Sequence, residues 1–453
     1  MGKFRIKDSD SSVHRSIDLF SRPQTNASFN DHDIVVYDPL TTGASNAKFL
    51  ISSRGAEYMY MRMAKLFVAI RIVADEDGAD LPDDEIVVPA NGIFSLFSQV
   101  DVEFNSKLMV DQTKNHPYAN IFDVLFDYDP DGQSGTLEAM GYYKDTAYQH
   151  SKLGGFGDLE IPSNQGNKTR WQHVKGSRRY EMEGPIGADV LTCERMFLNS
   201  VDILLTFHFS SPEFFLMAEK TDKRYKIVVE DMYIKVPHVS LNSAVLLGHD
   251  ATLKSFPSVY MYMKKEFSAH VIDKKTLKST AQNVFQGKLP NKLVIALVDD
   301  RAYAGDYERN PFEFGHFGLK SVDARVNSKL VNSKRIKLET SDPDNLQYVE
   351  AYSDFLNGVG RWDKNRGCIV QRGDFCGGYT LFVYDFENGF ADEANYPVFE
   401  KGAMHVDFTF NASRDHAIQA IFCGYFRTAF GIDNSRRIVS PPKTRGSAAA
   451  AGG

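Results

Sequence analysis

The stretch VDVEFNSKL at residues 100–108 returns as VDARVNSKL at residues 322–330, with six of nine positions identical at an offset of 222. A segment that recurs at a long period marks a structural unit that one chain uses more than once. The period is about half of the 453-residue chain. The sequence therefore predicts two copies of one domain, in which this segment forms a strand, a polar turn and the start of the next strand.

The flanks of the two segments also correspond. A loop with closely spaced phenylalanines leads into each copy, at residues 91–97 and 310–317. Aromatic and aliphatic residues with helical spacing follow each copy, around Tyr118 and Tyr348, and DPDG at residues 129–132 ends the first of these predicted helices, near 116–127. The same order of loop, strand, turn and helix favours duplication over a chance likeness between two ordinary β-hairpins.

Length and composition favour an all-β chain. A chain of 453 residues fits two domains of about 200 residues each. Phenylalanine (33) and tyrosine (21) are abundant and tryptophan (2) is scarce, and aromatic side chains are typical of strands with large buried areas. Many short apolar runs, long polar connections and the lack of a βαβ rhythm predict two tandem antiparallel β-sandwiches with short helices.

The domain boundaries follow from changes in composition. The start is polar without a sustained period, and residues 129–185 are rich in Gly, Asn, Gln, Lys and Tyr, which is typical of a long functional or mobile loop. The basic, Ala/Gly-rich end is expected to be disordered in isolation. We predict an N-terminal arm (1–45), a first sandwich (46–240) with a long loop insertion (129–185), a linker (241–254), a second sandwich (255–433) and a C-terminal tail (434–453).

The charge of the chain argues against a general nucleic-acid binder. The 52 basic and 59 acidic residues give a net charge of −7, so any nucleic-acid contact must be local. The pairs and runs at Arg178–Arg179 and residues 334–337 are predicted to be surface or subunit-contact charges. The best candidate for a non-specific DNA phosphate contact is the tail, with four basic residues and no acid: Arg436, Arg437, Lys443 and Arg445.

Cysteines and apolar runs indicate the compartment. The four cysteines show no Cys-x-x-Cys spacing, and no apolar N-terminal run precedes a cleavage site, so we expect reduced thiols in a chain made inside the cell and not secreted through a signal peptide. No run of 18 apolar residues occurs, so no membrane span is predicted. The cysteines are Cys193, Cys368, Cys376 and Cys423.

The motifs that carry catalysis or bind metal are weak here. GQSG at residues 132–135 approaches a nucleophile elbow, but it follows a predicted helix instead of a strand, so Ser134 is not predicted to be a nucleophile. His208 and His405 lie in strand-like segments and are predicted to be structural, while Cys368 and Cys376 without nearby partners are a weak metal signal. Adjacent acids are predicted to be solvated at turns and strand ends, at Asp83/Asp84, Glu230/Asp231 and Asp299/Asp300.

Several further blocks, in a fixed order, carry a family resemblance. They are QVDVEFNSKL (99–108) followed by Pro117 and Tyr118, residues 198–215 ending in PEFF, GKLP (287–290), GDYERNPFEF (305–314), GGYTL (377–381) and IDNSRRIV (432–439). With these blocks the chain resembles the hexon-like, double jelly-roll major capsid protein of adintoviruses, Polinton (Maverick) elements and related viruses. The resemblance covers roughly residues 45–440, and the loops, including 129–185, depart from the pattern.

The resemblance implies a structural protein of a virion and no enzyme. Two eight-stranded antiparallel jelly rolls would stand side by side, and three chains would form a pseudo-hexagonal capsomer that tiles an icosahedral shell around a DNA genome. Its partners would be further copies of itself, neighbouring capsomers, and penton and minor capsid proteins. No catalytic residue, metal ligand or cofactor is expected, and the functional surface would be the subunit interfaces.

Two alternatives remain at this stage. One is a carbohydrate-binding or carbohydrate-active protein built from tandem β-sandwiches. The other is a host-domesticated capsid relative that keeps the fold but builds no virion. The oligomeric state of the purified protein separates the first alternative from the capsid hypothesis, and the presence or absence of shells in electron microscopy separates the second.

Overall fold

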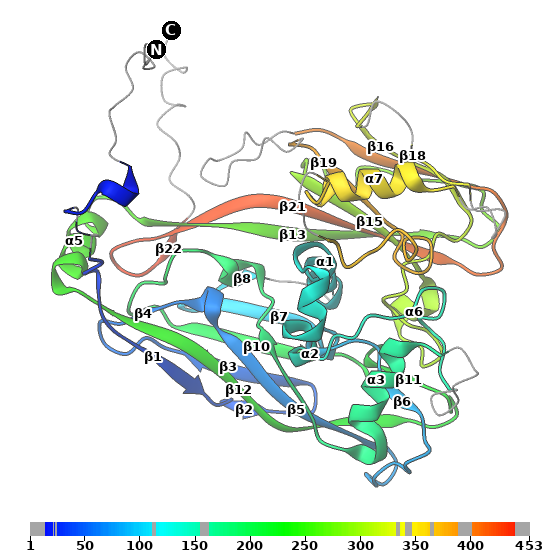
Figure 1. The fold of residues 1–453 in the computed structure, drawn as a ribbon, viewed down its shortest axis with the longest axis horizontal. Helices are drawn as coiled ribbons and strands as arrows, with labels where there is room; N and C mark the ends of the chain where they lie inside the picture. The colour runs from blue at the N-terminus through cyan, green and yellow to red at the C-terminus, as the bar shows by residue number, and fades with distance from the viewer. Residues whose placement is uncertain are drawn as a thin grey trace.

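Two β-sandwiches built from consecutive halves of the chain form the body of the molecule (Figure 1). The computed structural model describes residues 14–20, 22, 25–110, 115–154, 163–331, 336–339, 347–362, 367–387 and 401–439. The named strands pair antiparallel throughout.

The first sandwich has two five-stranded sheets. The first contains β1 (Phe29–Tyr37), β12 (Tyr225–Leu241), β5 (Lys65–Ala74) and β9 (Tyr180–Pro185) in that order, with β4 (Tyr58–Met59) on β12. The second contains β2 (Thr41–Thr42), β3 (Asn46–Ile51), β10 (Ile203–Phe209), β7 (Phe97–Phe104) and β8 (Lys107–Val110). A separate two-stranded sheet pairs β6 (Val87–Pro89) with β11 (Leu216–Ala218).

The second sandwich repeats this plan. One sheet contains β13 (Ser258–Ile272), β21 (Ile418–Ile432), β15 (Lys292–Asp299) and β19 (Leu381–Asp385), with β22 (Ile438–Val439) on β21. The other contains β14 (Lys278–Ala281), β20 (Met404–Phe410), β16 (Leu319–Val326) and β17 (Lys329–Leu330), with β18 (Ile336–Lys337) on β16.

The two halves share one topology. The short strands β2, β4, β6 and β11 in the first half, and β18 and β22 in the second, lie outside a common set of eight. If the eight strands are numbered along the chain within each half, both halves have sheet orders 1-8-3-6 and 2-7-4-5. The predicted all-β fold of two tandem eight-stranded jelly rolls is confirmed.

Short helices connect the strands. Two follow equivalent hairpins, α1 (His116–Asp127) in the first half and α7 (Val349–Gly358) in the second, as the sequence predicts. The others are η1 (Arg15–Ile17), η2 (Met61–Met63), η3 (Ile93–Leu96), η4 (Pro130–Ser134), α2 (Thr136–Ala139), α3 (Gln165–Val174), η5 (Lys175–Ser177), η6 (Asp189–Thr192), α4 (Pro212–Phe215), α5 (Ser243–Leu253) and α6 (Asp300–Ala304).

The repeated segment is the same hairpin in each sandwich, β7–β8 and β16–β17. Its two turn residues have positive φ in both copies: 46° and 65° at Asn105 and Ser106, and 48° and 70° at Asn327 and Ser328. Two-residue hairpin loops favour this backbone because its twist matches that of the strands, and Asn tolerates the left-handed region better than most residues. The Asn-Ser pair is therefore retained for its backbone conformation.

The Asn of each turn also ties the hairpin to a neighbouring strand. The Asn105 N–H donates to the Asp202 carbonyl (2.9 Å), and its Oδ1 accepts from the Asp202 N–H (2.8 Å). Asn327 makes the same two contacts with Ala403, both at 3.0 Å. Asp202 and Ala403 directly precede β10 and β20, so the repeated Asn fixes two adjacent strands in each copy.

Alternation of side chains builds the two cores. In β20, Met404, Val406, Phe408 and Phe410 are buried while the residues between them are partly exposed, which is the period of a strand with one buried face. Strand β15 is buried at all positions but its first, because its other face also packs against protein. A strand covered on both faces carries a continuous apolar run.

Three predicted segments need correction. The arm is wrong beyond residue 28, because β1 and β2 belong to the first sandwich. The insertion contains α2, α3 and the sheet strand β9, so it is no structureless loop. The helix α5 lies within the predicted linker. The tail begins with an ordered turn and β22 up to Val439, and its remainder lies outside the described residues.

Candidate functional site at the junction of the two sandwiches

Aromatic side chains join the two sandwiches around α1. Tyr118 stacks on Tyr303 with ring centroids 5.8 Å apart, and its ring lies 5.7 Å from that of Phe312. One turn later, the ring of Phe122 lies 5.6 Å from that of Phe314. Offset and edge-on aromatic pairs contribute beyond the area that they bury. The junction is therefore packed like a core, and the two halves form one unit.

A second aromatic cluster lies at the other end of the junction. Phe197 of the first half stacks on Tyr260 (5.0 Å between centroids), which in turn stacks on Phe430 (5.1 Å). Phe430 also lies 5.6 Å from Phe104, the last residue before the first repeated turn. The first hairpin thus contacts the long strands β13 and β21 of the second sandwich.

A buried lysine connects β13 to the first half. The Nζ of Lys265 donates to Asp123 Oδ2 of α1 (2.5 Å) and to Asp189 Oδ1 of η6 (3.3 Å), and its backbone N–H donates to Asp189 Oδ2 (2.8 Å). Burial alone lowers the pKa of Lys265, but the two carboxylates outweigh it and raise the pKa above its ordinary value. Lys265 is therefore a charged structural group of the junction.

The insertion clamps the two halves through a second buried ion pair. Arg170 of α3 is 1% exposed at its side chain and donates to Asp145 Oδ1 and Asn167 Oδ1, both at 2.6 Å. The other oxygen of Asp145 accepts from Asn310 Nδ2 of the second half (3.1 Å). A buried charge pair is stable only when its remaining hydrogen-bonding groups are also satisfied, and Asn310 contributes to this.

Further contacts extend the clamp over the second sandwich. The Tyr379 hydroxyl donates to the Asp145 carbonyl and accepts from the Asp145 N–H, both at 3.1 Å. Lys144 forms an ion pair with Asp374. His150 packs edge-on against Tyr379, and burial lowers the pKa of His150 against the opposing effect of Asp145. The insertion thus contacts the other half of its own chain.

Two arginines of the second half bind carbonyls of the first. Arg361 donates to the carbonyls of Phe126 (3.0 Å) and Asp127 (2.6 Å) at the end of α1, where helical carbonyls lack internal partners. Arg436 donates to the carbonyl (2.8 Å) and side-chain oxygen (2.6 Å) of Asn199. Each arginine therefore connects the second half of the chain to the first half by hydrogen bonds.

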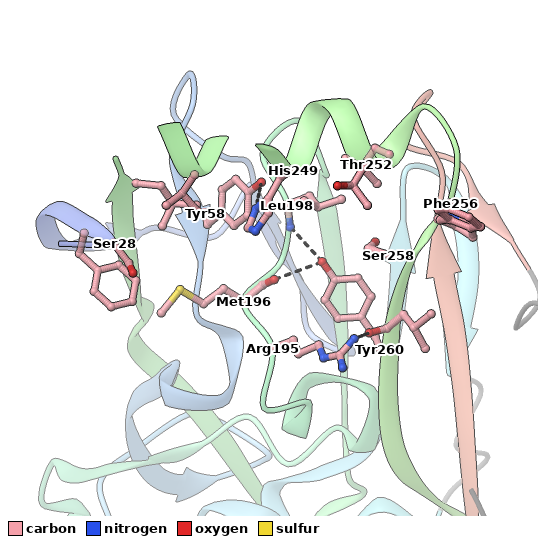
Figure 2. A pocket seen from close by; sticks show the side chains of 16 residues that line it. Ser28, Tyr58, Arg195, Met196, Leu198, His249, Thr252, Phe256, Ser258 and Tyr260 are labelled. Carbon is pink, nitrogen blue, oxygen red and sulfur yellow. Dashed lines mark hydrogen bonds between the residues drawn. The ribbon is translucent and has the colours of Figure 1, made fainter. Parts of the chain in front are cut away.

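An apolar pocket of about 520 Å³ opens beside α5 (Figure 2). Its tyrosine and arginine side chains already have partners. Tyr58 Oη lies 3.1 Å from His249 Nδ1, the Tyr260 hydroxyl donates to the Met196 carbonyl (3.1 Å), and Arg195 donates to the Val259 carbonyl (2.7 Å). The pocket therefore presents mainly apolar surface.

The candidate catalytic residues are not brought together. Ser134 is exposed on η4, and its hydroxyl donates only weakly to the Asp131 carbonyl (3.4 Å). His208 Nε2 pairs across strands with Asp101 Oδ2 (2.9 Å), while His405 Nδ1 accepts from the Asn283 N–H (3.4 Å) in the other sandwich. Both histidines have the structural hydrogen bonds that the sequence predicts.

The acidic pairs and cysteines also have structural surroundings. Arg71 and Arg179 bind Glu230, and Lys175 lies 3.7 Å from Asp83. The prediction that Asp299 is solvated is wrong, because its side chain is buried and caps α6. All four cysteines are buried and free, and burial raises the pKa of Cys376 to about 12 and raises that of Cys368. Within the described ranges, no group of three or more His, Cys, Asp or Glu residues is arranged to hold a metal ion.

The basic clusters divide into three cases. Arg179 forms ion pairs with Glu181, Glu230 and Asp231, in agreement with a surface charge. Arg436 is held by Asn199, so this residue of the tail is wrong as a candidate DNA contact. Lys334, Arg335, Lys443 and Arg445 lie outside the described residues.

The residues that matter most at the junction were not found from the sequence. Lys265, Asp189, Arg170 and Asp145 belong to no motif, and each reaches a partner far along the chain or in the other half. The only sequence signal is that Asn310 and Tyr379 lie inside the family blocks 305–314 and 377–381. Their role as partners of Asp145 required the tertiary structure.

Comparisons with known proteins give relatives in sequence and in fold. No family model matches the chain. An uncharacterized protein of Caenorhabditis elegans is 23% identical over 350 residues, covering 75% of this chain and 79% of that protein. A chain of the Sputnik virophage structure superposes with a TM-score of 0.61 at 8% identity, over 96% of this chain and 93% of that one.

Two further solved structures share the fold. A chain of the PBCV-1 virus capsid has a TM-score of 0.53 at 9% identity, over 91% of this chain and 97% of that one. The Faustovirus major capsid protein has a TM-score of 0.51 at 9% identity, over 91% and 92%. The chain has the double jelly-roll fold of these viral capsid proteins. No helix in the described part of the chain is long and apolar enough to cross a membrane.

Proposed function

We propose that this protein is a viral major capsid protein, of which three copies form a pseudo-hexagonal capsomer that tiles an icosahedral shell around a DNA genome. The observation that carries this proposal is the pair of topologically equivalent jelly rolls in one tightly joined unit. Three chains with two similar sandwiches each place six similar units around one axis. A rigid junction maintains this geometry, because the angle between the two units sets the shape of the tile.

The likeness to double jelly-roll proteins of three viruses supports a capsid role. The relative in an animal, together with the ordered blocks of the sequence, supports an origin among adintoviruses, Polinton elements and related integrated viruses. In this proposal the protein resides in the virion, contacts neighbouring capsomers and penton and minor capsid proteins, and catalyses no reaction. Arg437 and the basic residues that follow it remain the candidates for contact with DNA.

We propose a corrected division of the chain. The first unit runs from residue 29 to 241 and includes the insertion, which serves as an internal clamp. The helix α5 connects it to the second unit, from 258 to 439.

Purified full-length protein tests the proposal. Light scattering after size exclusion should give a species of three 51.0 kDa chains, about 153 kDa, and electron microscopy should show pseudo-hexagonal particles and, at high concentration, shells. A stable monomer that binds glycans would overturn the capsid proposal in favour of the carbohydrate-binding alternative.

One specific observation favours a second candidate. The relative in Caenorhabditis elegans is encoded by an animal, as a host-domesticated capsid protein would be. A domesticated protein would form the same trimer but no shells under conditions of pH, salt and concentration that assemble viral capsids. Shell formation by the purified protein would remove this candidate.

A further inference from the structure

The short N-terminal arm exposes three large apolar side chains. Ile17, Leu19 and Phe20 are 68%, 76% and 93% exposed, respectively. Single exposed apolar residues are common, but three within four residues on a segment outside both sandwiches form a patch that folding of the chain does not require. Such a patch indicates a contact with something other than the chain's own core.

The apolar pocket beside α5 offers a complementary surface. Its walls include Phe29, Leu198, Leu241, Val245 and Leu253. A volume of about 520 Å³ lies in the range of pockets that take ligands of several apolar groups. The hydroxyls of its tyrosines already bond to His249 and the Met196 carbonyl, so the side chains of Ile17, Leu19 and Phe20 could bind there without unpairing these hydroxyls.

We propose that residues 17–20 of one copy insert into the pocket beside α5 of a neighbouring copy. This inference deepens the proposed function, because it rests on self-association and names one contact of the capsomer. Each copy carries one arm and one pocket, so the contact joins two different surfaces. Such heterologous contacts form closed rings when the rotation between copies closes, as it does in a trimer.

The same chain does not fill its own pocket. Phe29 lines the pocket, and the nine residues from Phe20 to Phe29 span up to about 30 Å when extended, which is long enough to reach back or to reach a neighbour. If the arm folded into its own pocket, Phe20 would be buried, whereas it is almost fully exposed. A second copy is therefore the occupant that satisfies both surfaces.

Cysteine cross-linking between differently tagged copies tests the contact. Copies with Phe20→Cys and copies with Thr252→Cys, whose residue lines the pocket, are co-expressed with tags of different size and oxidised. The four native cysteines are buried and contribute little background. We expect a disulfide-linked heterodimer, since only a contact between copies can join the two tags.

Matched controls define the contact. Adding Ile17→Ser and Leu19→Ser to the Phe20→Cys copies should reduce the cross-linked product by roughly tenfold or more, because the arm loses its apolar anchors. A partner with Leu330→Cys, at an exposed position on the second hairpin, should give no product. Circular dichroism and thermal unfolding should be unchanged in the arm variants, since these residues lie outside the sheets.

A second measurement uses dissociation of the capsomer. The triple variant Ile17→Ser, Leu19→Ser, Phe20→Ser should raise the concentration at which the capsomer dissociates by roughly 100-fold. Val245→Asp in the pocket should have a similar effect, whereas Leu247→Ser, on an exposed position of α5 outside the pocket, should have little.

The outcomes separate this inference from the proposed function. A chain that carries both Phe20→Cys and Thr252→Cys is oxidised as a further sample. If it forms an internal disulfide while the differently tagged copies form no heterodimer, the arm fills its own pocket and the inference is overturned. Trimers without any cross-link, or with unchanged dissociation in the triple variant, would also overturn it while the capsid proposal stands. A protein that stays monomeric at all concentrations would overturn both.

Discussion

The helices α1 and α7 follow the same hairpin in the two jelly rolls, yet their surroundings differ. Ten of the twelve residues of α1 are buried, because it lies between strands of the two sandwiches, whereas α7 buries three residues, Ala351, Phe355 and Gly358, against β19 (Figure 1). Gly358 permits this close packing, since a Cβ there would lie 2.4 Å from the Val383 carbonyl oxygen.

The two helices illustrate how the copies of a duplicated domain become different from each other. The hairpin and the helix that follows it are determined locally and are retained in both copies. Residues on the helix surface then adapt to different neighbours. In the first copy they form the core of the junction. In the second they pack mainly against β19 and β18 of their own sandwich, and Phe355 also reaches Phe126 at the end of α1.

The largest expected effect comes from removing an aromatic side chain of the junction. Tyr118→Ala on α1 should lower the free energy of unfolding by about 3–5 kcal/mol, since Tyr118 is buried and packs against Tyr303 and Phe312 of the other half. Tyr348→Ala, just before α7, should cost about 1 kcal/mol, because Tyr348 is only partly buried. Urea unfolding measures both, and equal losses would contradict the difference between the helices.

Removal of the buried lysine should also weaken the junction strongly. Lys265→Met leaves Asp189 buried without its cation and should cost about 3 kcal/mol or more. The adjacent Lys264→Met is the matched control, because Lys264 forms only a half-exposed ion pair with Glu266 and should cost less than about 1 kcal/mol. Chemical denaturation compares the two, and a small effect of Lys265→Met would show that its ion pairs do not hold the halves together.

A histidine of α1 should make stability depend on pH. Burial lowers the pKa of His116 to about 3 in the folded protein, from an ordinary value of 6.5. The folded state therefore keeps His116 neutral, and the unfolded state binds the extra proton below pH 6.5. Above pH 6.5, His116 is neutral in both states and does not lower the free energy of unfolding. As the pH falls from 6.5 towards 3, the free energy of unfolding decreases by about 1.4 kcal/mol per pH unit.

The variant His116→Asn isolates this effect. We measure the free energy of unfolding between pH 7 and pH 4. Below pH 6.5 it should fall more steeply with pH in the wild type than in the variant, by about 1.4 kcal/mol per pH unit, which corresponds to the uptake of one proton. Parallel curves for the two proteins would show that His116 does not remain neutral in the folded state.

The smallest expected effects concern the repeated turn. Asn105→Ala and Asn327→Ala should each cost about 1–2 kcal/mol, because alanine tolerates positive φ poorly and loses the bond to the residue before the next strand. Asn105→Ala should cost slightly more, since Asn105 Nδ2 also donates to the Arg436 carbonyl (2.7 Å).

Glycine substitutions separate the two causes in the turn. Asn105→Gly and Asn327→Gly keep the backbone conformation and lose only the side-chain bonds, so they should recover part of the stability lost with alanine. Thermal unfolding would reveal the order, and a glycine variant less stable than the alanine variant would contradict the role of positive φ.

Much of the fold could be predicted because its signals are local. The alternation in residues 403–410, the Asn-Ser turns and the helical spacing around Tyr118 each depend on a few neighbouring residues, and the structure has β20, two equivalent hairpins and α1 at these places. The strand β1 was missed because most of its side chains are exposed, so its sequence lacks the apolar period on which the prediction depended.

The duplicated, all-β character of the chain follows from local signals, since turn chemistry and the period of apolar residues act over short distances. Three other features depend on contacts between distant segments: the insertion clamps the second half of its own chain, Arg436 binds Asn199, and Lys265 is charged within the junction. The reason is physical. A buried charge gains its stability from partners in other segments, and nothing in its own neighbourhood along the chain specifies which partners folding will bring near.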